Sequence, residues 1–247
     1  NVIVPIAGGR TLPYLAVTAH MDTVLAPRRP GDIRVRPDGG FEGPGVTDNG
    51  PGLAALLALA GVLSLGKLVE NPRRNILLVA NVAEEGEGNL LGMKYLCEES
   101  PFASRIDAYL VLDGASIGHI TAQGLGSRRF EIGVEGRGGH SWNDYGRANP
   151  VHALGRAIGA LAEMALPAEP KTTLTVGMVE GGAGVNSIPS SARAKVDIRW
   201  GSESAIRRVV ARMEAEVRRA MRRENQSALD TLSNLRIREI GYRPAAA

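Results

Sequence analysis

The sequence predicts an α/β protein in two parts, a mostly parallel sheet followed by a βαββαβ unit of the ferredoxin-like kind. In the first half, apolar runs of strand length alternate with helical patterns, which is typical of a parallel sheet covered on both faces. In the second half, strands with alternating polar and apolar residues surround two helical patterns, in the order of a split βαβ sandwich. Gly118, Gly124 and Gly126 mark the joint.

The first half supplies the elements of the parallel sheet. Apolar runs at 14–19, 75–83 and 108–112 have the length of buried strands. A run rich in Leu and Ala at 50–65 and a shorter run at 90–99 predict helices. The chain also opens inside what reads as a strand.

The second half supplies four strands and two helices. Alternation and β-branched residues predict the strands, and apolar residues at helical spacing predict the helices. The strands are expected at 128–135, 172–179, 191–200 and 235–240, and the helices at 149–164 and 202–224. We therefore divide the chain into a first domain, 1–123, and a second domain, 124–235.

Composition and charge exclude several classes of protein. Of 247 residues, 44% are hydrophobic and 22% are charged, as in ordinary globular proteins. A net charge of +3 is too small to indicate nucleic acid, and the basic run at 207–223 reads as a solvated helix face. No run reaches the roughly 18 apolar residues of a membrane span, and residues 1–9 lack a signal-peptide pattern. The single cysteine, Cys97, fits a reducing compartment, so we expect a cytoplasmic protein.

Polar clusters follow the apolar runs of the first half. His20-x-Asp22 comes after the first run, Glu84-Glu85 after the second and Asp113 after the third. In open α/β sheets, ligands bind at the carboxyl ends of the strands. Taken singly, each cluster has a plainer interpretation: a hydrogen-bonded structural histidine, an exposed acidic turn and a turn aspartate.

Asp48 adds a fourth candidate, between two glycine-rich turns and directly before the Leu/Ala helix. Taken alone it reads as a helix N-cap. The joint occurrence of the four clusters favours a metal site instead, because buried carboxylates need a compensating charge. Imidazole and carboxylates without cysteine suit zinc, or less specifically manganese or cobalt. One glutamate of the pair can bind metal while its neighbour acts as general base on a water.

The second half contains one further candidate, His140, within Gly136-Arg137-Gly138-Gly139-His140-Ser141. The small residues around it allow close approach by a ligand. The alternative is a histidine on a flexible loop.

This ordered set resembles the aminoacylase and carboxypeptidase-G-like family of di-zinc peptidases, which includes tripeptidases, dipeptidases and acyl-amino-acid deacylases. The resemblance covers essentially the whole chain. Smaller matches add to it, namely Gly181-Gly182 with Asn186-x-Ile188-Pro189, Asp197-Ile198-Arg199 and Ile240-Gly241-Tyr242-Arg243-Pro244. It implies a zinc-peptidase catalytic domain with an inserted dimerisation, or lid, domain. It also makes residues 236–247 a strand that returns to the catalytic domain.

The resemblance implies two Zn²⁺ ions and assigns their ligands. Asp48 would bridge the two ions. His20 and Asp113 would complete one site, and Glu85 would belong to the other. The peptide bond between Asp48 and Asn49 is expected to be cis.

Catalytic and substrate-binding roles follow from the same resemblance. Asp22 would orient the histidine ligand, and Glu84 would be the general base. His140 would stabilise the oxyanion, usually in the active site of a partner subunit. Asn186 and Arg199 would hold the substrate, Arg199 through the planar fork that matches a carboxylate. A homodimer formed through the lid domain is therefore expected.

One departure from the family concerns its last metal ligand, a histidine in a C-terminal segment that completes the first domain. No histidine follows His152 in this chain. We therefore expect an incomplete catalytic domain, by truncation rather than degeneracy. We also expect the chain alone to bind metal poorly and to have little activity.

Alternative functions stay open beside a peptidase of short peptides. Deacylation of N-acyl amino acids would use the same residues. The missing histidine supports a non-catalytic binding or dimerisation module, whereas Glu84 argues against one, because a pure binder needs no general base. A dinucleotide-binding protein is disfavoured because no Gly-x-Gly-x-x-Gly follows the first strand. Neither nucleic acid nor a membrane is expected as a partner.

Overall fold

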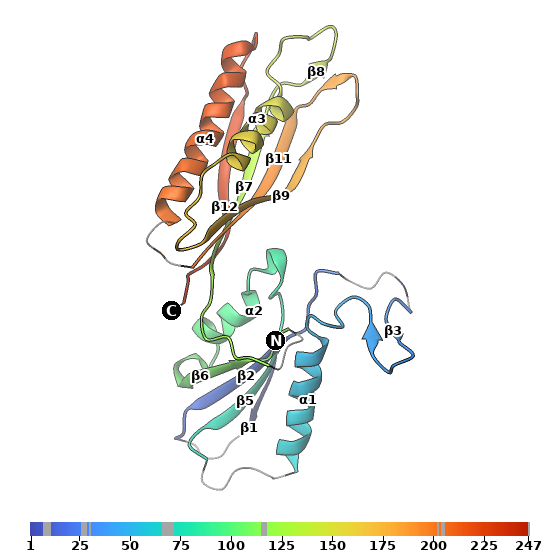
Figure 1. The fold of residues 1–247 in the computed structure, drawn as a ribbon, viewed down its shortest axis with the longest axis vertical. Coiled ribbons are helices and arrows are strands. Elements are labelled where there is room, and N and C mark those ends of the chain that lie inside the picture. The colour runs from blue at the N-terminus through green and yellow to red at the C-terminus, as the bar shows by residue number, and fades with distance from the viewer. Residues whose placement is uncertain are drawn as a thin grey trace. The chain divides into compact units, whose positions relative to one another are not determined.

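The computed structural model describes residues 1–6, 11–25, 29, 31–65, 72–114, 118–201, 203 and 206–246. The chain forms two compact units, Asn1–Ile120 and Thr121–Ala247 (Figure 1). In this described part of the chain, none of the helices combines the length and apolarity needed to cross a bilayer.

The first unit is built on a four-stranded sheet in the order β1-β5-β2-β6. β2 (Tyr14–His20) lies parallel to both β5 (Asn75–Asn81) and β6 (Ile106–Val111). β1 (Val2–Ile6) runs antiparallel to β5 at one edge. The expected mostly parallel sheet is confirmed, and its three parallel strands all end at the same edge.

Helices cover both faces of this sheet, because successive residues of a strand point to opposite sides. α1 (Gly50–Ser64) packs on one face in a cluster with Val17, Ala19 and Leu78. α2 (Leu91–Lys94) and the π-helical turn Tyr95–Glu99 lie on the other face (Figure 1). There Leu96 packs with Tyr14, Ala16, Leu77 and Val79. The helix predicted over 90–99 therefore divides into a short α-helix and a wider turn.

Short elements connect these layers. β3 (Arg34–Val35) pairs with β4 (Phe41–Glu42) in an exposed hairpin, and 3-10 turns span Gly86–Gly88 and Ala103–Arg105. The sequence did not predict this hairpin. Its strands are two residues long and exposed, so they are too short to show the alternation of apolar and polar residues that predicts a strand.

The second unit is a four-stranded antiparallel sheet in the order β12-β7-β11-β9. Its strands are β7 (Gly126–Glu135), β9 (Thr172–Gly181), β11 (Ser191–Trp200) and β12 (Asn234–Arg243). With a helix after β7 and another after β11, the chain follows the βαββαβ order, which confirms the ferredoxin-like prediction.

Both helices of the second unit lie on one face of its sheet (Figure 1). α3 (Pro150–Ala162) begins after Asn149, whose side chain accepts hydrogen bonds from the N–H groups of Val151 and His152, as a helix cap does. α4 (Ile206–Ser227) lies beside α3. One cluster of buried residues joins the sheet to both helices; it includes Phe130, Leu154, Ile198, Trp200 and Met213.

The strand expected to return to the first domain belongs to the second unit instead. β12 pairs with β7 from Asn234 opposite Glu135 to Arg243 opposite Ser127. Leu235 and Ile237 pack against the core of the second unit, and this burial keeps the strand in that sheet. The described residues of 236–247 therefore do not form a strand of the first sheet.

A two-stranded ribbon stands at one end of the second unit. β8 (Gly139–His140) pairs with β10 (Ser187–Ile188), with His140 opposite Ser187. The ribbon follows the end of β7 and precedes the start of β11, so it lies at the end of the sheet opposite to that where the chain enters at Gly126 (Figure 1).

Candidate functional site

His20, the last residue of β2, is buried at 3% exposure. Its Nδ1 lies 2.8 Å from the carbonyl oxygen of Asp22. A carbonyl oxygen only accepts hydrogen bonds, so Nδ1 carries the proton and Nε2 keeps its free lone pair. Within the described residues, Nε2 is one of two buried side-chain atoms without a hydrogen-bond partner; the other is Thr18 Oγ1. A buried imidazole nitrogen in this state fits a metal ligand.

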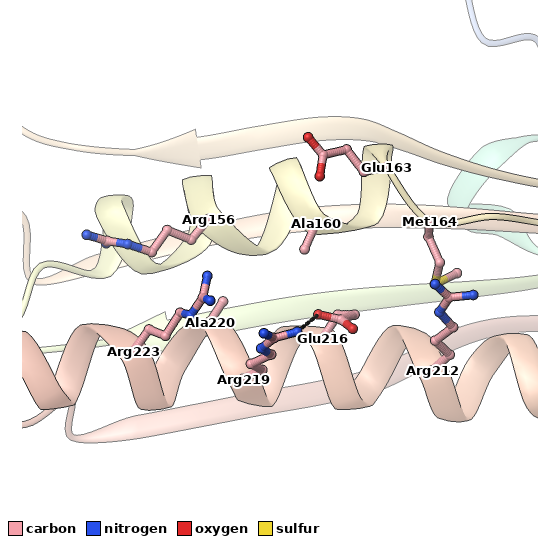
Figure 2. A pocket seen from close by; sticks show the side chains of 9 residues that line it. All are labelled: Arg156, Ala160, Glu163, Met164, Arg212, Glu216, Arg219, Ala220 and Arg223. Carbon is pink, nitrogen blue, oxygen red and sulfur yellow. Dashed lines mark ion pairs between the residues drawn. The ribbon is translucent and has the colours of Figure 1, made fainter.

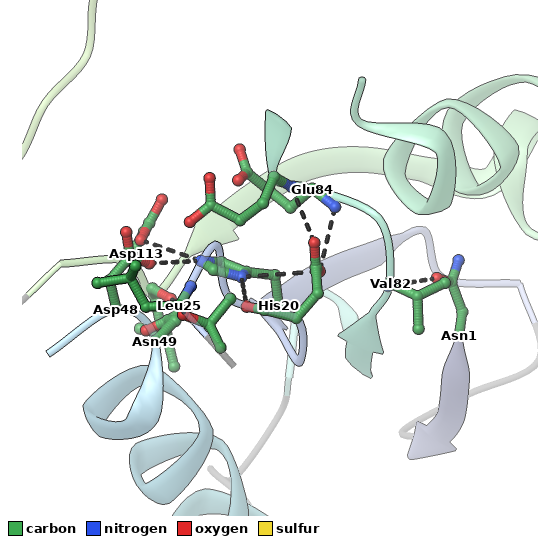
Figure 3. Close-up of polar contacts among 12 residues, drawn as sticks. Asn1, His20, Leu25, Asp48, Asn49, Val82, Glu84 and Asp113 are labelled. Atoms are coloured by element: carbon green, nitrogen blue, oxygen red, sulfur yellow. Dashed lines mark hydrogen bonds and ion pairs between the residues drawn. The ribbon is translucent and has the colours of Figure 1, made fainter. Parts of the chain in front are cut away.

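Two aspartates face this nitrogen (Figure 3). Asp48 Oδ1 lies 2.8 Å from His20 Nε2 and Asp113 Oδ1 lies 3.6 Å from it. Although 2.8 Å is a short distance, the pair does not have hydrogen-bond geometry. The contact is therefore a close approach of two potential ligand atoms.

Asn49 explains how Asp48 reaches this place. The N-cap of α1 is Asn49 rather than Asp48, because Asn49 Oδ1 accepts from the N–H of Gly52 at 3.1 Å. Asn49 Nδ2 donates to the carbonyl of Leu112 at 2.8 Å, so the start of α1 is tied to the residue before Asp113. A Cβ at Gly52 would collide with both of these acceptor oxygens. The helix-cap interpretation of Asp48 is thus wrong, and the expected cis bond between Asp48 and Asn49 is present.

Asp22 fixes the turn that carries the two glutamates. Its carboxylate accepts from the N–H of Glu84 at 3.1 Å and from that of Glu85 at 2.9 Å. Ala83, just before them, takes a φ of +54°, a value uncommon outside glycine. The carboxylate itself stays 3.8 Å from His20 Nδ1. The carbonyl of Asp22 therefore orients the histidine, whereas the expected partner was its carboxylate.

These contacts bring the predicted ligands of the first unit together. One ligand atom from each of His20, Asp48 and Glu85 lies within 4.8 Å of the other two, and Asp113 adds its oxygen beside His20. His20 lies at the end of β2, Asp48 lies in the loop that precedes α1, and Glu85 lies in the turn after β5. A nitrogen and hard oxygens in this arrangement can hold a divalent metal such as zinc.

The electrostatics of the group reflect crowded carboxylates. Burial raises the pKa of Glu84 above its ordinary value, and the surrounding aspartates raise it further against the opposing charge of His20. Burial also raises the pKa of Glu85, as do Asp48 and Glu84. Burial acts to lower the pKa of His20, but its hydrogen bond to Asp22 and the carboxylates raise it overall.

The pKa of Asp22 moves in the opposite direction. Burial works against its ionisation, but the N–H groups of Glu85 and Glu84 outweigh burial and hold the pKa of this carboxyl below its ordinary value. In contrast to Glu84 and Glu85, the charged form of Asp22 is stabilised by hydrogen bonds from the backbone.

A cavity of about 220 Å³ adjoins the group. His20, Glu84 and Asp113 line it together with the apolar residues Leu90, Met93 and Val111. Thr18, two residues before His20 on the same face of β2, also borders it. Glu84 thus faces a space beside the candidate metal ligands.

His140 lies in the second unit, on the exposed ribbon strand β8. Its Nδ1 accepts from the N–H groups of Trp142 at 3.2 Å and Asn143 at 3.4 Å. Nε2 is then the protonated nitrogen and can donate. The backbone N–H of His140 donates to Asp144 Oδ2 at 2.7 Å. The ring can therefore offer its Nε2–H as a hydrogen-bond donor, which suits oxyanion stabilisation.

Asn186 and Arg199 lie at opposite ends of the second sheet. The carbonyl of Asn186 accepts from the N–H of Ser141 at 3.0 Å, next to His140. Arg199 pairs with Ser127, where the chain enters the unit, and its Nε donates to Asp197 at 2.7 Å. A strand rises about 3.3 Å per residue, so Arg199 lies roughly 25 Å along β11 from its first residue. The structure brings Asn186 to His140 but not Arg199.

A second charged cavity, of about 260 Å³, lies between α3 and α4 (Figure 2). Its arginines are Arg156, Arg212, Arg219 and Arg223. Arg156 pairs with the buried Glu224, and Arg219 lies 3.8 Å from Glu216. All arginines of α4 are exposed, which confirms the solvated face predicted for 207–223. This cavity offers no histidine or clustered carboxylates for a metal.

Sequence reasoning missed two positioning residues, Asn49 and Asp144. Asn49 stands directly before Gly50-Pro51 at the start of a helix, which is a recognisable capping signal. Asp144 left no such signal. Its role depends on the turn that returns it to the backbone of His140, and nothing in the local sequence specifies that turn.

Comparison with known proteins identifies the family. The model described as Peptidase family M28 matches residues 1–131, more than half of the chain, and the model described as Peptidase dimerisation domain matches 125–225. The chain belongs to this group of peptidases. A peptidase catalytic unit followed by a dimerisation domain is the organisation expected for the aminoacylase and carboxypeptidase-G-like family, so the predicted membership is confirmed.

The curated relatives are longer than this chain. A probable carboxypeptidase of Ajellomyces capsulatus is 28% identical over 224 residues, which cover 82% of this chain and 50% of that protein. A probable carboxypeptidase of Aspergillus oryzae is 27% identical over 232 residues, or 85% and 54%. The chain therefore spans about half the length of the curated relatives it matches.

Solved structures of similar fold include peptidases. A tripeptidase from Staphylococcus aureus superposes with a TM-score of 0.66 at 20% identity, covering 98% of this chain and 62% of that one. A di-peptidase from Saccharomyces cerevisiae gives a TM-score of 0.71 at 16% identity, covering 99% and 64%. At these identities the likeness establishes the fold alone.

Proposed function

We propose that the full-length protein is a metal-dependent hydrolase that cleaves an amide bond of short peptides, with Glu84 as general base. The observation that carries this proposal is the convergence of His20, Asp48 and Glu85 within 4.8 Å, next to a glutamate that faces a cavity. Membership in a peptidase family supports the reaction class. The tripeptidase and di-peptidase folds are consistent with short substrates.

Two metal ions, Zn²⁺ or alternatively Mn²⁺ or Co²⁺, would be held by the residues already placed. His20 and Asp113 would serve one ion, Glu85 would serve the other, and Asp48 would bridge them. The orphaned Nε2 of His20 and the hard oxygens around it fit such ions. When bound, the ions supply Lewis acidity and lower the pKa of a coordinated water.

Glu84 would move the protons. Its carboxylate takes a proton from the attacking water and then delivers it to the nitrogen of the leaving amine. The N–H groups of Glu84 and Glu85 are both fixed by Asp22, so the base and the adjacent ligand are oriented by one carboxylate. Asp22 thereby acts as a positioning residue for both.

The second unit would complete the site across a homodimer. We assign His140 to the oxyanion in the partner subunit's active site, and Asn186 to substrate binding beside it. Arg199 would bind a substrate carboxylate through its planar guanidinium. The dimerisation-domain match over 125–225 supports the homodimer, and the single Cys97 supports the expected cytoplasmic location.

The deciding experiment measures metal content and peptide hydrolysis together on the full-length protein. We expect close to two metal ions per subunit, loss of hydrolysis after chelation and recovery on adding Zn²⁺. His20→Ala should lose metal, whereas His152→Ala, an exposed histidine of α3, should keep both metal and activity. A panel of dipeptides, tripeptides and N-acetyl amino acids separates a peptidase from a deacylase. A metal-free, inactive full-length protein would favour the non-catalytic module.

A further inference from the structure

The space between α3 and α4 forms a groove of about 260 Å³ (Figure 2). Nine described residues line it, and none of them is aromatic. Ala160 lies on its α3 wall and Ala220 on its α4 wall. Because both are alanines, the two helices leave space that larger side chains would fill. We call this space the arginine groove, and all of its lining residues belong to the second unit.

A row of arginines on α4 borders the groove. Arg212, Arg219 and Arg223 are seven and four residues apart, a spacing that places side chains on one face of a helix. With a rise of about 1.5 Å per residue, Arg219 and Arg223 lie about 6 Å apart along the axis, and Arg212 lies about 10 Å farther. In Figure 2, the side chains of Arg212 and Arg223 extend from α4 toward α3, whereas the carboxylate of Glu163 points away from α4.

The protein neutralises the guanidinium groups of the groove unequally. Arg156, on the opposite wall, forms an ion pair with the buried Glu224, so its charge is used within the fold. Arg219 lies 3.8 Å from Glu216, which is longer than a hydrogen bond. Among the described residues, no carboxylate pairs with Arg223. The donors of Arg219 and Arg223 are therefore available to an anion in the groove.

We propose that the arginine groove is a binding site for a condensed phosphate, either free or as the phosphate tail of a nucleotide, held by Arg219 and Arg223. The planar guanidinium fork donates parallel hydrogen bonds to phosphate oxygens. Since none of the lining residues is aromatic, no ring stacks on a base, and the phosphates alone are recognised. The inference goes beyond the proposed function, because it uses neither a candidate metal ligand nor a candidate catalytic residue.

The ligand is a compact anion rather than a long polyanion. Glu216 lies between Arg212 and Arg219 in the row and adds a negative charge there. A polyanion stretched along α4 would pass this carboxylate and be repelled by it. A chain of two or three phosphates can stay at the end of the groove that holds Arg219 and Arg223.

The first test titrates tripolyphosphate into the full-length protein at low ionic strength and follows binding by calorimetry. We expect one bound anion per subunit, and a loss of affinity of about 10-fold in Arg223→Gln, the size of a lost charge-assisted hydrogen bond. Arg222→Gln removes the same charge from an exposed neighbour that does not line the groove, and should change affinity by less than about 2-fold. Tripolyphosphate also binds metal ions, but that contribution is equal in all variants, because the substituted residues lie in the second unit.

A second variant tests the space rather than the charge. Ala160→Leu keeps every charged group and fills the groove with a larger side chain, so it should also weaken binding of tripolyphosphate by at least about 10-fold. Unchanged affinity in Ala160→Leu would place the anion outside the groove and overturn the inference. Equal losses in Arg222→Gln and Arg223→Gln would overturn it as well, because the general charge of α4 would then attract the anion.

A comparison of anions tests the ligand class. We expect tripolyphosphate and ATP to bind alike, because only their phosphates are contacted, and citrate to bind more weakly, because each carboxylate carries less charge than a phosphate. Citrate binding as tight as that of tripolyphosphate would overturn the assignment to phosphates. Much tighter binding of ATP would contradict recognition through the phosphates alone, and no binding of any of the three would remove the site.

Discussion

The two units of this protein bury their sheets differently. The first sheet has helices on both faces and a core divided into two clusters. The second sheet has helices on one face and a single larger cluster, and its open face carries ion pairs. On that face Arg238 lies 2.9 Å from Glu131, and Arg193 pairs with Glu180.

This difference shows where each unit can place charge. In the first unit both faces are covered, so polar groups gather where the parallel strands end. The carboxylates there crowd together, and burial with mutual repulsion raises the pKa of Glu84 and Glu85. In the second unit, the carboxylates of Glu131, Glu180 and Asp197 are paired with arginines. The crowded carboxylates of the first unit would be stabilised by a bound cation. The paired carboxylates of the second unit are neutralised by arginines of the same chain.

The strongest test of the comparison is Glu84→Gln in the full-length protein. We expect hydrolysis to fall about 10²- to 10⁴-fold, because a general base is lost, while metal content and the stability of the second unit stay unchanged. Glu87→Gln, an exposed carboxylate of the same turn, serves as the control and should be nearly silent. Steady-state kinetics with metal analysis measure both, and equal activity of the two variants would contradict the role of Glu84.

A substitution in the core of the second unit should lower stability without changing metal binding. Ile198 is completely buried, so Ile198→Ala should cost about 2–5 kcal/mol of unfolding free energy through the cavity it leaves. Urea unfolding followed by the fluorescence of the buried Trp200 reports this unit. Metal affinity in the first unit should not change. A parallel loss of metal affinity would show that the two units are coupled more closely than their separate cores indicate.

Asp22→Asn tests the turn that orients the two glutamates. One of the two acceptor oxygens becomes an amide nitrogen, which cannot accept from the N–H of Glu84 or Glu85. We expect metal affinity to fall about 10-fold, at the low end for residues that support metal ligands. His20 should keep its orientation, because the carbonyl of Asp22 remains. Calorimetric zinc titration gives the affinity, and a loss above about 100-fold would place the carboxylate on the metal itself.

The smallest expected effect is the pH dependence of the second unit. Burial works against ionised Asp197, but Arg199, Ser127 and Arg129 outweigh it and hold its pKa below the ordinary 3.8. A lowered folded-state pKa gives stability that is present above 3.8 and lost as pH falls through the folded-state pKa. The stability difference between wild type and Asp197→Asn should therefore be constant near neutral pH and shrink below 3.8. A difference that grows on acidification would contradict this assignment.

Most of the helices and strands, and the set of candidate ligands, could be predicted from the amino-acid sequence. The strand 191–200 was predicted with the bounds that the structure shows, and the helix predicted at 50–65 differs by one residue. The spacing of apolar residues is a property of each short segment, so it can be recognised without knowing the fold. The candidate ligands could be grouped because parallel strands end at one edge, which made His20, Glu85 and Asp113 neighbours in space.

Which atoms hold the candidate ligands in place became clear from the folded chain. Asn49 caps α1 and so frees Asp48, the carbonyl of Asp22 rather than its carboxylate holds His20, and β12 stays beside β7. The sheet register also separated Arg199 from His140. Each outcome depends on contacts between residues far apart in the chain or on backbone geometry at a single turn. The composition and periodicity of a segment do not encode such contacts, because they arise only when the segments pack together.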